Sequence, residues 1–123
     1  MDNNGQAYHT KLNQDYFKKK INRPITVAVD FYKLASQKDS TNFFHEFSLR
    51  FPRFIDCLKS KYPEINAADL KVCTLLKLDF STKEIAVVTN STVRAIQSRK
   101  FRIRKRLKID SQTDINIYML MLG

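Results

Sequence analysis

Hydrophobic residues recur at helical spacing along most of this chain, and the pattern predicts an all-α fold. In the C-terminal half, Asn66 can cap one helix, and Ser81 or Thr82 can cap the next. Asp79 lies at a tight turn, and Asn90 can adopt the left-handed conformation that ends a helix. The expected helices cover about residues 67–77, 83–89, 92–107 and 113–122. A short helix, a turn and a longer helix are the layout of a helix-turn-helix.

The first half of the chain has weaker helical patterns. Phenylalanines recur at helical spacing after Thr41, which can cap that helix, and Pro52 opens the next segment. Residues 25–35 fit either an alternating strand or one helical face, and we favour the helix. Residues 15–20 are weakly helical, and residues 1–14 are expected to form a mobile arm. The aromatic side chains expected in the core are Phe43, Phe44, Phe47, Phe51 and Phe54.

The helix expected over 67–77 has an apolar face and a polar face. The apolar face comprises Val72, Cys73, Leu75 and Leu76. The polar face comprises Lys71, Thr74 and Lys77. Leu70 falls on the outer side, where the upstream helices could cover it.

The helix expected over 92–107 separates an apolar stripe from a polar arc. At about 100° per residue, Ile96, Ile103 and Leu107 fall in one narrow stripe, with Val93 and the stem of Lys100 at its edge. The stripe is predicted to be buried, which leaves the opposite arc free to form hydrogen bonds.

The positive charge is concentrated around this helix. The chain of 123 residues has 22 Lys and Arg against 12 Asp and Glu, a formal net charge of +10. Residues 81–108 contain nine cations and a single anion, Glu84, so this segment carries +8 and the other 95 residues +2. Such a cluster favours a polyanionic partner, above all double-stranded DNA. A solvated basic helix is the plain alternative, and a membrane surface fits less well because a broad apolar face is lacking.

The polar arc and its surroundings supply candidate DNA contacts. In the major groove, Arg can read guanine, Gln can read adenine, and an apolar ring can touch a thymine methyl. The candidate base contacts are Gln97, Ser98, Phe101 and Arg102. The candidate phosphate contacts are Thr82, Lys83, Arg94, Arg104, Lys105, Arg106 and Lys108. The plain alternatives are a helix cap for Thr82 and packing against the domain for Phe101.

Other classes of function lack support. No apolar run approaches the roughly 18 residues of a membrane span, and the N-terminus lacks a secretory signal, so we expect a cytoplasmic protein. The two glycines lie near the chain ends, which leaves no glycine-rich loop for a nucleotide. Cys57 and Cys73 form no zinc motif, and His9 and His45 have no evident catalytic partners. We expect no cofactor, no metal and no enzymatic activity.

Residues Ile65–Ile109 resemble, without a gap, the LuxR-type (GerE-type) DNA-binding domain of bacterial transcription regulators. The most specific pieces are DLKVCTLLKLDFSTKEIA, residues 69–86, and FRIRKRL, residues 101–107. The upstream stretch FPRFIDCLKSKYPEI is similar to the segment preceding this domain in regulators with tetratricopeptide repeats, although no such repeats occur here. Asp79 and Asn90 stand where the family usually has glycine, and Arg99 where it often has histidine.

The resemblance implies a four-helix helix-turn-helix domain over residues 65–123, with 92–107 as its recognition helix. It also implies that Gln97, Ser98 and Phe101 face bases. Residues 15–64 would form an N-terminal helical extension. The family's fourth helix is often its dimer contact, and residues 113–122 are apolar nearly all round. A homodimer through Ile117 and Leu120 is expected, unless the N-terminal helices cover that helix as an integral lid.

The leading interpretation is a sequence-specific, DNA-binding transcription regulator that inserts the 92–107 helix into the major groove. RNA polymerase is a further candidate partner. One alternative is a promoter-binding module like region 4 of a sigma factor, although the 64 residues before Ile65 show no basic aromatic stretch for a second promoter element. Another alternative is an interaction module whose basic helix binds an acidic protein.

Overall fold

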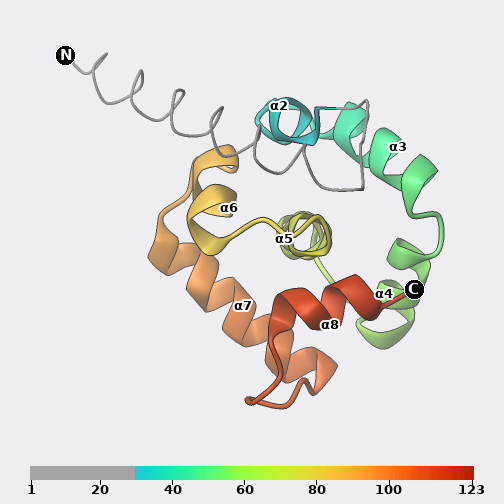
Figure 1. The fold of residues 1–123 in the computed structure, drawn as a ribbon, viewed down its shortest axis with the longest axis vertical. Coiled ribbons are helices and arrows are strands. Elements are labelled where there is room, and N and C mark those ends of the chain that lie inside the picture. The colour runs from blue at the N-terminus through green and yellow to red at the C-terminus, as the bar shows by residue number, and fades with distance from the viewer. Residues whose placement is uncertain (1–29) are drawn as a thin grey trace.

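The computed structural model describes residues 30–123, which form seven α-helices and no strand (Figure 1). The helices are α2 (Phe31–Ala35), α3 (Thr41–Arg50), α4 (Phe54–Lys61), α5 (Ala67–Lys77), α6 (Thr82–Val88), α7 (Val93–Leu107) and α8 (Ile115–Met121). The expected all-α class is confirmed. The expected arm, the weak helix over 15–20 and residues 25–29 of the ambiguous segment lie outside the described residues. The described end of that segment forms α2, as favoured. No helix within residues 30–123 has both the length and the apolar character to cross a bilayer.

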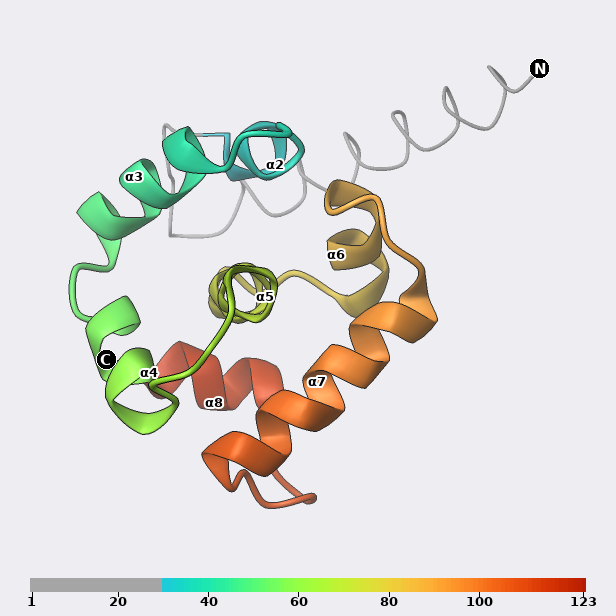
Figure 2. The same ribbon diagram turned by 180° about the vertical axis from the view of Figure 1, so that it is seen from behind.

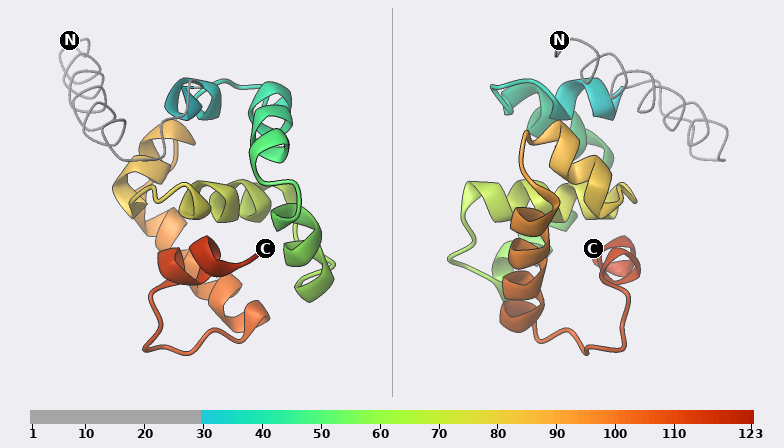
Figure 3. Two further views of the ribbon diagram at one scale, coloured as in Figure 1. Left: turned by 45° about the vertical axis from the view of Figure 1, so that its right-hand side comes forward. Right: turned by 90° about the vertical axis from the view of Figure 1, so that its left-hand side faces the viewer.

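Helix α5 lies at the centre, and the other six helices form a ring around it (Figures 1 and 2). Seen from the side, α5 passes between α8 and the pair α2 and α3 (Figure 3). The predicted apolar face of α5 is buried. Thr74 and Lys77 are buried as well, Lys71 is half-buried and Leu70 packs against the core, so the second side of α5 is covered too. The reason is that the ring covers α5 from all sides.

The buried polar groups of α5 have hydrogen-bond partners, which is what makes their burial tolerable. The Thr74 hydroxyl donates to the Lys71 carbonyl oxygen at 2.7 Å. The Lys77 ammonium donates to the carbonyl oxygens of Leu120 and Leu122 at 2.9 and 2.8 Å, where α8 ends. It also lies over the rings of two phenylalanines, and burial lowers the pKa of Lys77. The two carbonyl groups that bind Lys77 lie 43 and 45 residues away in sequence, so helical periodicity could not predict them.

Side-chain caps set the starts of the three central helices. The Asn66 side chain accepts from the Asp69 amide at 2.7 Å at the start of α5. Ser81, rather than Thr82, caps α6, and it forms a reciprocal capping box with Glu84. Thr92 caps α7. The predicted starts of these helices are therefore correct to within one residue.

The turns on either side of α6 require left-handed backbone. Asp79 has a φ of 67° and Asn90 a φ of 53°. Both residue types tolerate this region better than most, which confirms the expected turn positions. In the first half, Ser40 is the N-cap of α3 and Thr41 its first residue, so the expected cap is one residue too late.

Residues 30–62 share a single core with helices α5 to α8. The buried ring of Phe47 lies near those of Phe31, Phe43 and Phe54, at centroid distances of 6.4, 6.1 and 5.6 Å. The Lys71 ammonium of α5 donates to the carbonyl oxygen of Ala35, at 2.8 Å, and so holds the end of α2. The described part of the extension is therefore packed into the fold rather than tethered to it.

We expect Phe47→Ala to destabilise the whole protein by about 3–5 kcal/mol, because it opens a cavity in this aromatic cluster. Urea unfolding, followed by circular dichroism, measures the change. Leu49→Ala is the matched control on α3: Leu49 is 66% exposed, and its loss should cost less than about 0.5 kcal/mol. Equal, small effects of both substitutions would contradict the shared core.

Candidate nucleic-acid interface

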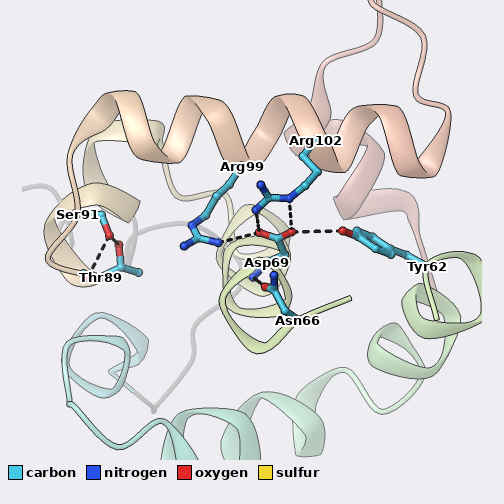
Figure 4. A network of polar contacts seen from close by, with 7 residues as sticks. All are labelled: Tyr62, Asn66, Asp69, Thr89, Ser91, Arg99 and Arg102. Carbon is cyan, nitrogen blue, oxygen red and sulfur yellow. Dashed lines mark hydrogen bonds and ion pairs between the residues drawn. The ribbon is translucent and has the colours of Figure 1, made fainter. Parts of the chain in front are cut away.

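Helices α6 and α7 pack against each other, and α7 also packs on α5. Ile96, Ile103 and Leu107 are buried on the inner side of α7, as predicted. The Lys100 ammonium donates to the Thr82 hydroxyl at 2.9 Å and links the two helices. Thr89 and Ser91 form a hydroxyl contact of 3.1 Å in the turn between them (Figure 4). This arrangement leaves the outer side of α7 open along its length.

A buried carboxylate on α5 holds two arginines of α7. Asp69 is 0% exposed, and its Oδ1 accepts from Arg99 Nη1 at 3.0 Å and from Arg102 Nη2 at 2.7 Å. Arg102 Nε donates to Oδ2 at 2.9 Å, so the Arg102 pair is bidentate. The Tyr62 hydroxyl, just after α4, approaches Oδ2 at 3.4 Å (Figure 4). The cluster therefore joins α5, α7 and the end of α4 at one point.

The electrostatics of this cluster favour the charged carboxylate. Burial alone would raise the pKa of Asp69, but hydrogen bonds and charge from Arg102 and Arg99 outweigh it and hold that pKa below its usual range. The hydrogen bond to Asp69 likewise raises the pKa of Arg102. Because both arginines come from one face of α7, the ion pairs oppose rotation of the helix about its axis.

Two further cations of α7 have partners inside the fold. Arg104 Nη1 donates to the carbonyl oxygens of Thr113 and Asp110, at 2.9 and 3.3 Å, and so holds the loop before α8. Arg106 forms an ion pair with Glu64, and its guanidinium lies 5.1 Å from the ring centroid of Tyr62. Both residues are predicted phosphate contacts, and the structure gives each of them an intramolecular partner.

Four of the five remaining predicted phosphate contacts are exposed, and Thr82 is the exception. Lys83, Arg94 and Lys108 are exposed, and their side chains have no ion pair or hydrogen bond within residues 30–123. Lys105 is exposed, and its ammonium lies 5.1 Å from the ring centroid of Phe101. Thr82 is half-buried, with its hydroxyl accepting from Lys100. Open cations thus lie on α6, at both ends of α7 and just beyond it.

The predicted base contacts fall into two groups. Gln97, Ser98 and Phe101 are exposed on the outer side of α7. Phe101 is 62% exposed, so the alternative that it packs against the described part of the domain is wrong. Arg102, in contrast, directs its guanidinium inward to Asp69 while its side chain stays 46% exposed.

Asp69 and Val93 are the site residues that the sequence did not identify. Asp69 stands in the first turn of α5, where an acidic residue is ordinary for any helix. The sequence signal that could have found Asp69 is the pair of arginines three residues apart on α7, which share a face and can bind one anion together. Val93, expected at the edge of the buried stripe, is 39% exposed.

No group of three His, Cys, Asp or Glu side chains suited to a metal occurs among residues 30–123.

We expect Asp69→Asn to destabilise the protein by about 2–3 kcal/mol at pH 7, since both arginines lose their anion while keeping access to water. The pKa of Asp69 is lowered in the folded state, so its stabilisation is complete above the unfolded value of about 3.9 and declines as the pH falls below it. Urea unfolding at several pH values should show the gap between wild type and variant closing below about pH 4. Asp56→Asn, at an exposed site on α4, is the control. A gap unchanged down to pH 2 would contradict the ion-pair account.

The chain was compared with known protein families, curated proteins and solved structures. No family model, no curated protein and no solved structure matches it. The LuxR-type resemblance of Ile65–Ile109 therefore stays an expectation from the residues, and the function is to be inferred from the geometry of α6 and α7.

Proposed function

We propose that the protein is a sequence-specific, DNA-binding transcription regulator that inserts α7 into the major groove. The observation that carries this proposal is the outer side of α7, where exposed Gln97, Ser98 and Phe101 lie between open cations at the two ends of the helix. Uncharged side chains that can meet base edges, flanked by cations that can meet phosphates, match the two kinds of contact in a protein–DNA interface.

The packing of α7 supports the same proposal. The helix has 15 residues, and its inner side is fixed on α5 by apolar contacts and by the Asp69 ion pairs. An α-helix held by one side fits the width of the major groove with its other side. The short α6 and the turn at Asn90 precede α7, as in a helix-turn-helix of the LuxR type.

The intramolecular contacts revise the roles of individual cations. In our proposal Arg102 acts as a positioning residue through Asp69, and Arg104 holds the loop to α8. The phosphate contacts are Lys83, Arg94, Lys105 and Lys108, joined by Arg106. The Arg106–Glu64 pair is exposed on both sides, and such pairs are worth little, so a phosphate can replace Glu64.

The outer face of α8 supports a homodimer. Ile115 and Met119 are buried against the domain, whereas Ile117, Leu120 and Met121 are exposed. These three side chains are 53–78% exposed, although the Lys77 ammonium binds the carbonyl oxygens of Leu120 and Leu122 at the end of α8. A second copy of α8 would bury them, and two recognition helices would then bind two half-sites.

The strongest competing function is a basic module that binds an acidic protein. The same open cations would serve it, and an exposed phenylalanine also suits a protein interface. Sequence-selective binding to DNA is therefore what distinguishes the two functions. A sigma-factor-like promoter module would use the same face of α7 on DNA. We also propose a cytoplasmic location, with RNA polymerase as a further candidate partner.

Salt-titrated binding to duplex DNA tests the proposed function. Each protomer neutralises five phosphates with the cations above, so the expected slope of log K against log salt is about −4.5 per bound protomer and about −9 for the dimer. Lys105→Ala should make the slope shallower by about one per protomer and weaken binding to all sequences, whereas Gln97→Ala should relax base preference and leave the slope unchanged. Binding that is weak and indifferent to sequence would instead favour the acidic-protein module.

Ile117→Asp tests the dimer. We expect the wild type to be dimeric and the variant monomeric by light scattering, because a carboxylate cannot be buried unpaired in an apolar interface. Lys108→Asp, a charge change away from α8, should leave the dimer intact. A wild type that is monomeric at all accessible concentrations would contradict the proposed homodimer.

A further inference from the structure

The middle of the outer face of α7 lacks a free arginine. Arg99 and Arg102 are the arginines nearest to the centre of the helix, and both guanidinium groups are bound to Asp69. Arginine is the side chain that most often reads guanine, through two hydrogen bonds to its O6 and N7 atoms. With both of them held inward, no arginine at the centre of the face is free for that contact.

An uncharged row takes their place. Val93, Gln97 and Phe101 follow one another at intervals of four residues, so they lie along nearly one line of α7. Val93 is 39% exposed and Phe101 62% exposed, and Gln97 is exposed between them. The two apolar side chains flank Gln97 on the exposed side of a helix whose ends are basic. This arrangement fits a partner that offers apolar groups inside an anionic surface.

The orientation of Phe101 fits that purpose. The Lys105 ammonium lies 5.1 Å from its ring centroid, within the range of a cation–π contact. This contact restrains the ring on the helix surface and places a cation directly beside it. A phosphate that binds Lys105 would therefore bring the adjacent base edges up to the ring.

We propose that this row reads A·T base pairs, with Gln97 on an adenine and with Phe101 and Val93 on the 5-methyl groups of thymines. Adenine presents an acceptor and a donor that match the two ends of the Gln97 amide, and thymine is the one base with an apolar group in the major groove. This inference rests on the proposed function and makes it more specific: the protein should distinguish thymine from uracil.

The test begins with a selection of bound duplexes from a random library, using the full chain. In the recovered duplex, each thymine is replaced in turn by deoxyuridine, which removes only the methyl group. We expect at least one replacement to weaken wild-type binding about fourfold, which is the loss of affinity expected when one buried methyl group is removed. Phe101→Ala should bind the thymine duplex more weakly and lose the response to that replacement. Leu49→Ala, which removes an exposed apolar side chain on α3, should retain the full response.

The outcomes separate this inference from the function on which it rests. Salt-dependent, sequence-selective binding with no response to any uracil replacement would overturn the inference alone, as would a response that persists unchanged in Phe101→Ala. A recovered site with G·C pairs throughout its centre would also overturn it. Failure to retain any duplex would overturn the proposed function and the inference with it. Circular dichroism melting of Phe101→Ala excludes misfolding as the cause of a lost response.

Discussion

The buried charge of Asp69 is the constraint on which the orientation of α7 depends. A carboxylate without exposure to solvent needs cations and hydrogen bonds, and α7 supplies both through Arg99 and Arg102. The inner apolar stripe of α7 would tolerate some rotation, because apolar contacts are not directional. The bidentate pair with Arg102 is directional, so it selects which side chains of α7 face outward.

The same ion pairs divide the basic residues between two tasks. Arg99, Arg102 and Arg104 are used inside the fold, and Lys83, Arg94 and Lys108 stay open toward solvent. The high net charge is therefore not all available to a partner. One part of the charge forms the ion pairs and hydrogen bonds that hold the helices together. The other part lies around the uncharged row of Val93, Gln97 and Phe101.

Local chemistry explains how much of the structure could be predicted. The starts of α5, α6 and α7 follow from Asn66, Ser81 and Thr92, whose side chains accept from amides only three residues away. Long-range contacts explain what was missed. The burial of Lys77 depends on α8, and the inward orientation of Arg102 depends on a carboxylate 33 residues earlier. Neither partner leaves a signal in the helical periodicity of its own segment.

Chemical-shift mapping of the ¹⁵N-labelled protein with a selected duplex tests the central claim most directly. The account predicts that the largest amide shifts follow the outer side of α7, around Val93, Gln97 and Phe101, and the start of α6. Amides of α3 should change little. Shifts concentrated on α3 or on the outer face of α8, with α7 unaffected, would contradict the assignment of this face to DNA.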